Sequence, residues 1–100
     1  SKHYAPTTTT FLKSDVAKFI KRFPEKRIGL LLFRQKIEST TVIHQEVLSA
    51  KGDLKEAASN LYAAMHRLDA KELDMIVAEQ FPDFDLGKSI NDRLERATTK

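Results

Sequence analysis

Histidines are the first side chains to consider for catalytic or metal chemistry in this sequence. His3, His44 and His66 are far apart along the chain, and none stands in an HExxH pattern or at His/Asp ligand spacing. There is no cysteine to act as a thiolate ligand or nucleophile. We therefore interpret the three histidines as surface or structural residues, and we predict no metal site.

Carboxylates offer a second kind of acid–base chemistry. Glu79 with Asp83 or Asp85 forms a candidate carboxylate pair. All three stand in a polar loop with no evident environment to tune a general base, so solvated carboxylates are the preferred interpretation. We predict no catalytic residue in this chain.

The turn into the last predicted helix is a candidate anion site. Backbone N–H groups at a helix start attract anions, and Lys88 would add positive charge. Against this, the acidic loop before it would repel a phosphate, and neither GxGxxG nor GxxxxGK[ST] is present. A capped helix after an acidic loop is the preferred interpretation. The candidate anion-binding or domain-docking turn consists of Gly87, Lys88, Asn91 and Arg93.

The first residues, Lys2-His3-Tyr4-Ala5-Pro6, predict an exposed arm because they lack the apolar periodicity of a core element. Pro6 fixes its own φ and favours an extended Ala5. His3 and Tyr4 would then be displayed on a semi-rigid strut.

Apolar spacing in the rest of the chain predicts alternating strands and helices. Strands are expected at 8–12, 28–33, 40–48 and 73–78, and helices start at Ser14, at Asp53 and near Leu86. The connection before 40–48 is too short for a crossover helix, so the direction of that strand stays open. This order predicts an α/β fold, a three-layer Rossmann-like sandwich with a mostly parallel four- to five-stranded sheet and helices on both faces. Such sheets bind ligands at the carboxyl ends of their strands.

Composition limits the class of protein. With 100 residues, 41% hydrophobic and 31% charged, the chain fits one small folded domain, and its longest apolar run is too short to cross a bilayer. The absence of cysteine and of a signal peptide favours a cytoplasmic protein.

Charge is unevenly distributed along the chain. Residues 1–51 hold ten Lys and Arg against four Asp and Glu, whereas residues 52–100 hold seven against ten. The basic half could attract RNA or an acidic partner, but a solvated helix face is the preferred interpretation, since Phe19 and Phe23 are expected on the opposite, apolar face. The basic residues in question are Lys13, Lys18, Lys21, Arg22, Lys26, Arg27, Arg34 and Lys36.

Several segments together resemble a known family. Residues 2–6 resemble the KHYAP linker of long-form threonylcarbamoyl-AMP synthases, which joins a YrdC-like catalytic domain to a C-terminal accessory domain, the Sua-five domain. Residues 28–31, 61–69 and 90–97 are similar to its glycine-bearing central strand, its alanine-rich helix and its closing signature. Asp85 and Gln80 depart from the family, which usually has Gly and Pro there.

The resemblance implies separate roles for the linker, the accessory domain and the catalytic domain. Residues 1–7 would be the remnant of an interdomain linker and residues 8–100 one accessory domain. ATP, magnesium, threonine and bicarbonate would bind the YrdC-like domain, a partner in cis that makes threonylcarbamoyl-AMP for tRNA modification. Lys2, His3, Tyr4 and Pro6 of the linker would cover the cleft of the catalytic domain. The chain itself would bind no cofactor, would not contact a membrane and would contact tRNA only indirectly. A mere tether, an independent nucleotide-binding module and an RNA-docking module remain alternatives.

Overall fold

Strands and helices follow one another in the order that the sequence predicts. The computed structural model describes residues 5–98 of the chain. Along the chain the elements are β1 (Thr10–Lys13), α1 (Val16–Ile20), β2 (Ile28–Leu32), β3 (His44–Val47), α2 (Leu54–Asp69), β4 (Met75–Glu79) and α3 (Asp85–Thr98).

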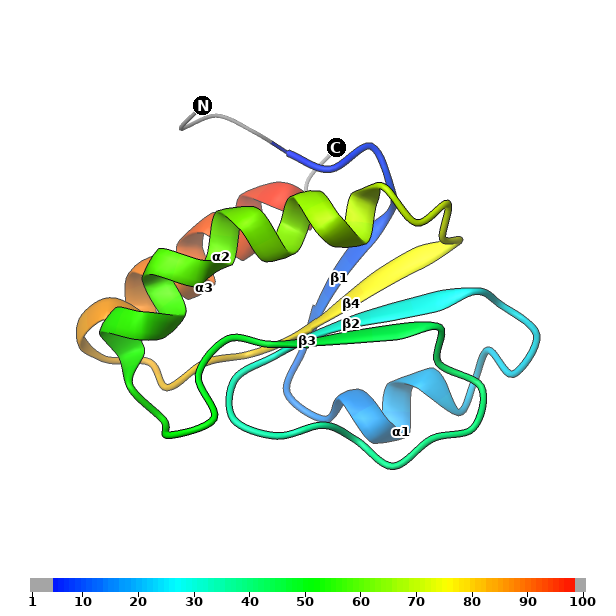
Figure 1. Cartoon of the computed structure of the whole chain (residues 1–100), viewed down its shortest axis with the longest axis horizontal. Helices are drawn as coiled ribbons and strands as arrows, with labels where there is room; N and C mark the ends of the chain where they lie inside the picture. Colours follow the sequence, from blue (N-terminus) through cyan, green and yellow to red (C-terminus); the bar gives the residue numbers. More distant parts are fainter. Residues whose placement is uncertain (1–4, 99–100) are drawn as a thin grey trace.

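The sheet has four parallel strands in the order β1-β4-β2-β3. One face of the sheet is covered by α1 and the other by α2 and α3 (Figure 1). The predicted α/β sandwich is confirmed. The direction of the third strand, which the sequence left undecided, is parallel to that of its neighbour β2. All amino ends of the strands thus lie at one edge of the sheet, which we call the amino edge, and all carboxyl ends at the opposite, carboxyl edge.

The strand predicted at 40–48 is too long, because its first residues form a turn. The Ser39 hydroxyl oxygen accepts hydrogen bonds from the N–H groups of Thr41 and Val42, at 3.2 and 3.3 Å. A serine side chain that bonds its own local backbone competes with sheet pairing. β3 therefore begins at His44, after the Ile43 N–H has bonded the Ile28 carbonyl at 2.8 Å.

The helix starts were predicted with mixed success. For α1 the N-cap is Asp15, not Ser14, because the Asp15 carboxylate accepts the N–H of Lys18 at 3.0 Å. For α2 the N-cap is Asp53, as predicted. Glu56 does not bond the Asp53 N–H directly. Instead, the Ser49 hydroxyl accepts that N–H at 2.8 Å and donates to the Glu56 carboxylate at 2.6 Å.

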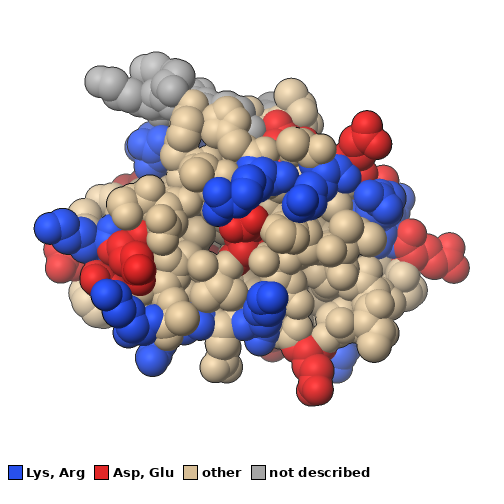
Figure 2. Space-filling model, viewed as in Figure 1, with Lys and Arg blue, Asp and Glu red and all other residues tan. Residues whose placement is uncertain are grey.

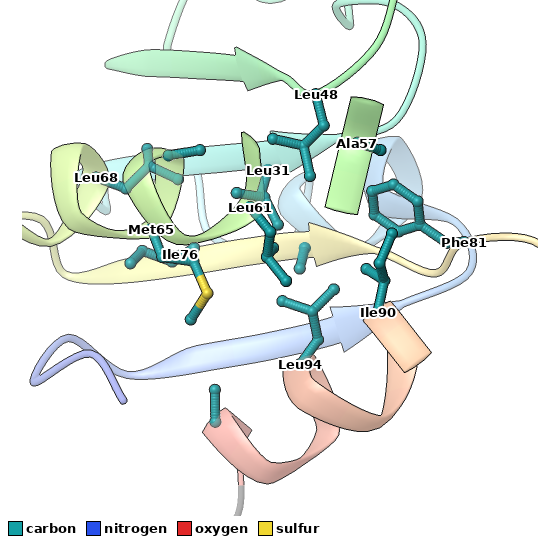
Figure 3. Packing of buried hydrophobic residues seen from close by; sticks show 13 residues of the cluster. Leu31, Leu48, Ala57, Leu61, Met65, Leu68, Ile76, Phe81, Ile90 and Leu94 are labelled. Atoms are coloured by element: carbon teal, nitrogen blue, oxygen red, sulfur yellow. The ribbon is translucent and has the colours of Figure 1, made fainter. Parts of the chain in front are cut away.

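Two apolar clusters hold the layers together, one on each face of the sheet. Figure 3 shows the larger one, in which Leu61 of α2 and Leu94 of α3 point into the same space above the sheet. Gly29 of β2 allows the close approach of this layer, since a Cβ there would lie 2.8 Å from a Leu68 methyl of α2. Ala57 and Ala64 of α2 are fully buried, whereas Ala63 is exposed.

Candidate functional site

The arm joins the domain at the amino edge. Lys2, His3 and Tyr4 lie outside the described residues, but the end of the arm is well defined. Pro6 is buried to less than 2% exposure. The Asp69 carboxylate at the end of α2 accepts the backbone N–H groups of Thr7 and Thr8 at 3.1 and 2.9 Å, and the Thr8 hydroxyl at 2.7 Å. We call this set of contacts the arm anchor.

Sequence analysis did not assign a function to Asp69, although one signal was present. A carboxylate in the last turn of a helix is disfavoured by the partial negative charge of the helix end. Asp69 is the last residue of α2, so its position calls for compensation by hydrogen-bond donors. Thr7 and Thr8 supply these donors from 61 to 62 residues away in the sequence.

The turn at the carboxyl edge is built around Asn91 and Gly87. The Asn91 amide oxygen accepts the Phe81 N–H at 2.8 Å, and its NH2 group donates to the Phe81 carbonyl at 2.9 Å. A Cβ on Gly87 would lie 2.0 Å from the Pro82 carbonyl oxygen. Gly87 and Asn91 are both buried, so each has a structural role in this turn.

The other parts of the candidate anion site differ in accessibility. Lys88 and Arg93 are exposed. The N–H groups of Gly87 and Lys88 both point to the Phe84 carbonyl oxygen, at 2.9 and 3.3 Å, so they are already engaged. An anion at this turn stays a prediction, and it would depend on the two exposed side chains.

The two departures from the family pattern have clear local structures. Asp85 has a φ of 53°, in the left-handed region where glycine is favoured. The Gln80 N–H donates to the Lys13 carbonyl at 2.9 Å, a bond that proline could not make. This chain thus has some backbone strain at one position and an additional β4–β1 hydrogen bond at the other.

The candidate carboxylate pair does not stand as a free pair. A Glu79 carboxylate oxygen accepts the Phe33 N–H at 2.8 Å, which extends the contact between β4 and β2, while Asp83 and Asp85 are exposed.

Within residues 5–98, no group of three His, Cys, Asp or Glu side chains could hold a metal ion. Nor does any described helix have the length and apolar character needed to cross a membrane.

The strongest ion pair joins β3 to α2. The Arg67 guanidinium donates to both Glu46 carboxylate oxygens, at 3.0 and 2.8 Å, and His44 lies 2.6 Å from the same carboxylate. The hydrogen bond from Arg67 lowers the pKa of Glu46, and the reciprocal bond raises the pKa of Arg67. His44 therefore has a structural partner, while His66 packs edge-on against the Tyr62 ring at 4.5 Å.

Two basic side chains near α1 contact the aromatic rings of this helix and its end. The Lys13 ammonium lies 4.6 Å from the centre of the Phe19 ring, and the Arg22 guanidinium lies 5.5 and 5.4 Å from the Phe19 and Phe23 ring centres. The prediction that these rings lie on the face opposite the basic residues is wrong for these cations. On the face shown in Figure 2, positive and negative side chains are interspersed.

The arm anchor and the predicted anion-binding or domain-docking turn are therefore not brought together. The arm anchor is at the amino edge with the end of α2, while Gly87, Lys88 and Asn91 follow β4 at the carboxyl edge (Figure 1). A ligand at one region would not contact the other.

Comparison with known proteins identifies the family. Residues 1–99 match the family model described as "Threonylcarbamoyl-AMP synthase, C-terminal domain". The chain belongs to this family. It is 28% identical over 101 residues to the threonylcarbamoyl-AMP synthase of Bacillus subtilis (strain 168), a match covering 95% of this chain and 29% of that protein. The chain thus spans less than a third of the length of this relative.

Two solved structures show the same fold as this threonylcarbamoyl-AMP synthase C-terminal domain. The Sua5 protein of P. abyssi, complexed with L-threonine, matches at 23% identity with a TM-score of 0.68, over 98% of this chain and 30% of that one. The C-terminal Sua5 domain from a Pyrococcus horikoshii protein matches at 22% identity with a TM-score of 0.62, over 91% of this chain and 93% of that one. The second match therefore covers most of both chains.

Proposed function

We propose that this chain is the accessory C-terminal domain of an L-threonylcarbamoyladenylate synthase, and that its arm covers the catalytic cleft of an absent YrdC-like domain. The observation that carries the proposal is the family match, which includes the arm as well as the folded domain. In this role the domain supports the formation of threonylcarbamoyl-AMP for tRNA modification.

The arm anchor supports the covering role on physical grounds. A segment that closes a cleft needs a fixed attachment, because an unanchored chain loses more conformational entropy on closing. Pro6 is buried and the backbone of Thr7 and Thr8 is bonded to Asp69. This attachment fixes the point at the amino edge from which the arm leaves the domain.

The cofactors of the proposed enzyme are assigned to the catalytic domain. The described residues contain no cluster of His, Cys, Asp or Glu that fits magnesium. As the family resemblance implies, we propose that ATP, magnesium, threonine and bicarbonate bind the YrdC-like partner in cis, with tRNA contacted only indirectly. The absence of cysteine from the sequence fits a cytoplasmic setting for this work.

The test is to replace Tyr4 with Ala in the full-length protein. We expect Tyr4→Ala to lower threonylcarbamoyl-AMP synthesis and pyrophosphate release several-fold, because an open cleft admits water to a reactive intermediate. Lys55→Ala, an exposed change on α2, is the matched control and should leave the rate unchanged. Equal rates for Tyr4→Ala, the control and the wild type would refute the covering role.

A deletion experiment separates this proposal from an independent module. Removing residues 8–100 from the full-length protein should lower its activity, and adding the domain back as a separate chain should restore it poorly, since the linked domain acts at a high effective concentration. Full restoration at equimolar concentration would favour a free-standing module.

A further inference from the structure

Three cationic side chains surround one hollow at the carboxyl end of β1. Its volume is about 290 Å³, and it lies between the end of β1 and α1. The carboxyl edge of a parallel sheet is the usual place for ligands in this class of fold. The hollow is lined by Lys13, Ser14, Asp15, Lys18, Phe19 and Arg22.

Two of these cations are held in place by aromatic rings. The Phe19 ring packs against Phe11 and Phe23, with ring centres 5.1 and 5.2 Å apart. The Lys13 ammonium and the Arg22 guanidinium lie against this ring at 4.6 and 5.5 Å from its centre. Cation–π contacts hold a charged group without neutralising it. Both cations therefore lose less side-chain freedom on binding an anion than free surface residues would.

The positive charge at the hollow is not compensated by ion pairs. No carboxylate among residues 5–98 forms an ion pair with Lys13, Lys18 or Arg22, whereas Arg67 is paired with Glu46. Asp15 is the single carboxylate in the lining, and one of its oxygens accepts the Lys18 N–H at 3.0 Å as the N-cap of α1. Three positive charges thus face one negative charge that already has a partner.

We propose that this hollow is a binding site for a phosphoryl group, supplied either by a small polyphosphate anion or by the backbone of a single-stranded RNA. Arginine and lysine donate short, charge-assisted hydrogen bonds to phosphate oxygens, and Ser14 adds a hydroxyl donor. These side chains would supply the attraction for the anion, since α1 has only five residues and a helix that short contributes little dipole. The proposal does not depend on the proposed function of the arm.

The test is a titration of the chain with pyrophosphate at low ionic strength, followed by calorimetry and by the amide shifts of residues 13–22. The triple variant Lys13→Gln, Lys18→Gln, Arg22→Gln should weaken binding at least tenfold, because an exposed charge pair contributes up to about fivefold each. The matched control, Lys51→Gln, Lys55→Gln, Lys71→Gln, removes three exposed or partly exposed lysines outside both candidate anion sites and should weaken binding less than twofold. Equal losses in the two triple variants would show a response to net charge alone and would overturn the site.

A second variant should strengthen binding. Asp15→Asn keeps an oxygen that can cap α1 but removes the negative charge at the hollow. We expect a two- to fivefold gain in pyrophosphate affinity, by the same estimate for one exposed charge. Should Lys13→Gln and Arg22→Gln disturb the aromatic packing, the exposed Lys18→Gln alone still tests the loss of affinity.

A parallel titration with a single-stranded RNA distinguishes the two sources of phosphate. Binding of RNA that is lost in the first triple variant, without binding of pyrophosphate, would assign the site to a phosphodiester backbone. Binding of pyrophosphate alone would assign it to a small anion. Saturable binding of neither probe by the wild-type chain would overturn the proposal.

Discussion

At the amino edge of the sheet, a single Asp69 carboxylate receives hydrogen bonds from Thr7 and Thr8, whereas at the carboxyl edge a single Asn91 amide bonds both backbone groups of Phe81. Asp69 is partly buried and joins segments 61 to 62 residues apart. Asn91 is 7% exposed and joins segments 10 residues apart. The Asp69 contact fixes where the arm enters the domain. The Asn91 contact fixes the shape of a local turn.

This difference leads us to expect different roles for the family motifs at the two edges. The closing signature, residues 90–97, contributes Ile90, Asn91, Leu94 and Ala97 to the interior, so its pattern is required for folding. Of the two arm residues that the structure describes, Pro6 is buried and Ala5 is exposed. We therefore expect changes at the carboxyl edge to lower stability, and changes at the arm anchor to act through the arm.

The largest expected effect is at Gly87. Gly87→Ala should lower the free energy of unfolding by about 3 kcal/mol or more, because the new Cβ would meet a backbone carbonyl that has little room to move. Gly29→Ala is the matched control, since its contacts are the ends of the Leu68 and Leu73 side chains and can adjust. Urea unfolding should show a clearly smaller loss for Gly29→Ala. A larger loss for Gly29→Ala would contradict the rigidity we assign to the carboxyl-edge turn.

Asn91→Leu should lower the free energy of unfolding by about 2–3 kcal/mol, since the N–H and carbonyl of buried Phe81 would lose their partners. The comparison variant is Asn60→Ala. Its amide makes one bond to the Leu48 carbonyl from an exposed position, so water can replace it. We call the two hydrogen bonds between Asn91 and Phe81 the Asn91 clamp. A larger loss of unfolding free energy for Asn60→Ala than for Asn91→Leu, measured by urea unfolding, would argue against its importance.

The Glu46–Arg67 pair predicts a dependence of stability on pH. The folded-state pKa of Glu46 is lowered, so its contribution is present above the unfolded pKa, about 4.3, and is lost as pH falls through the folded pKa. Glu46→Gln should cost about 1 kcal/mol at pH 7 and less at pH 3, because Arg67 is largely exposed. Urea unfolding at both pH values measures this, with exposed Asp83→Asn as the control. An equal cost at both pH values would exclude the ion pair as the cause.

The smallest expected effect is a gain in stability at Asp85. Asp85→Gly should raise the free energy of unfolding by about 0.5 kcal/mol, since glycine adopts a positive φ without strain. Glu72, at a φ of 55° before β4, is the equivalent position at the amino edge, and Glu72→Gly should give a similar gain. Thermal unfolding of the two variants should show a small rise in midpoint. A fall for either would mean that its side chain makes contacts that outweigh the strain.

The order of the elements and the main apolar stripes could be predicted from the sequence, because local periodicity and capping residues determine them. The Asp53 N-cap is of this kind. The direction of β3, the arm anchor and the Asn91 clamp could not be predicted. Each depends on which distant segments meet: Asp69 and Thr8 are 61 residues apart, and their pairing follows from the sheet order rather than from either residue type.

The most direct test of the central claim is the activity of the full-length protein carrying Asp69→Ala, compared with Glu46→Gln at a temperature where both are folded. Each change removes a carboxylate that accepts hydrogen bonds: Asp69 belongs to α2, and Glu46 bonds Arg67 of α2. Only Asp69→Ala releases Thr7 and Thr8. We predict a several-fold lower rate of threonylcarbamoyl-AMP synthesis for Asp69→Ala and a rate near that of the wild type for Glu46→Gln. A wild-type rate for Asp69→Ala would contradict the claim that the amino edge positions the arm for function.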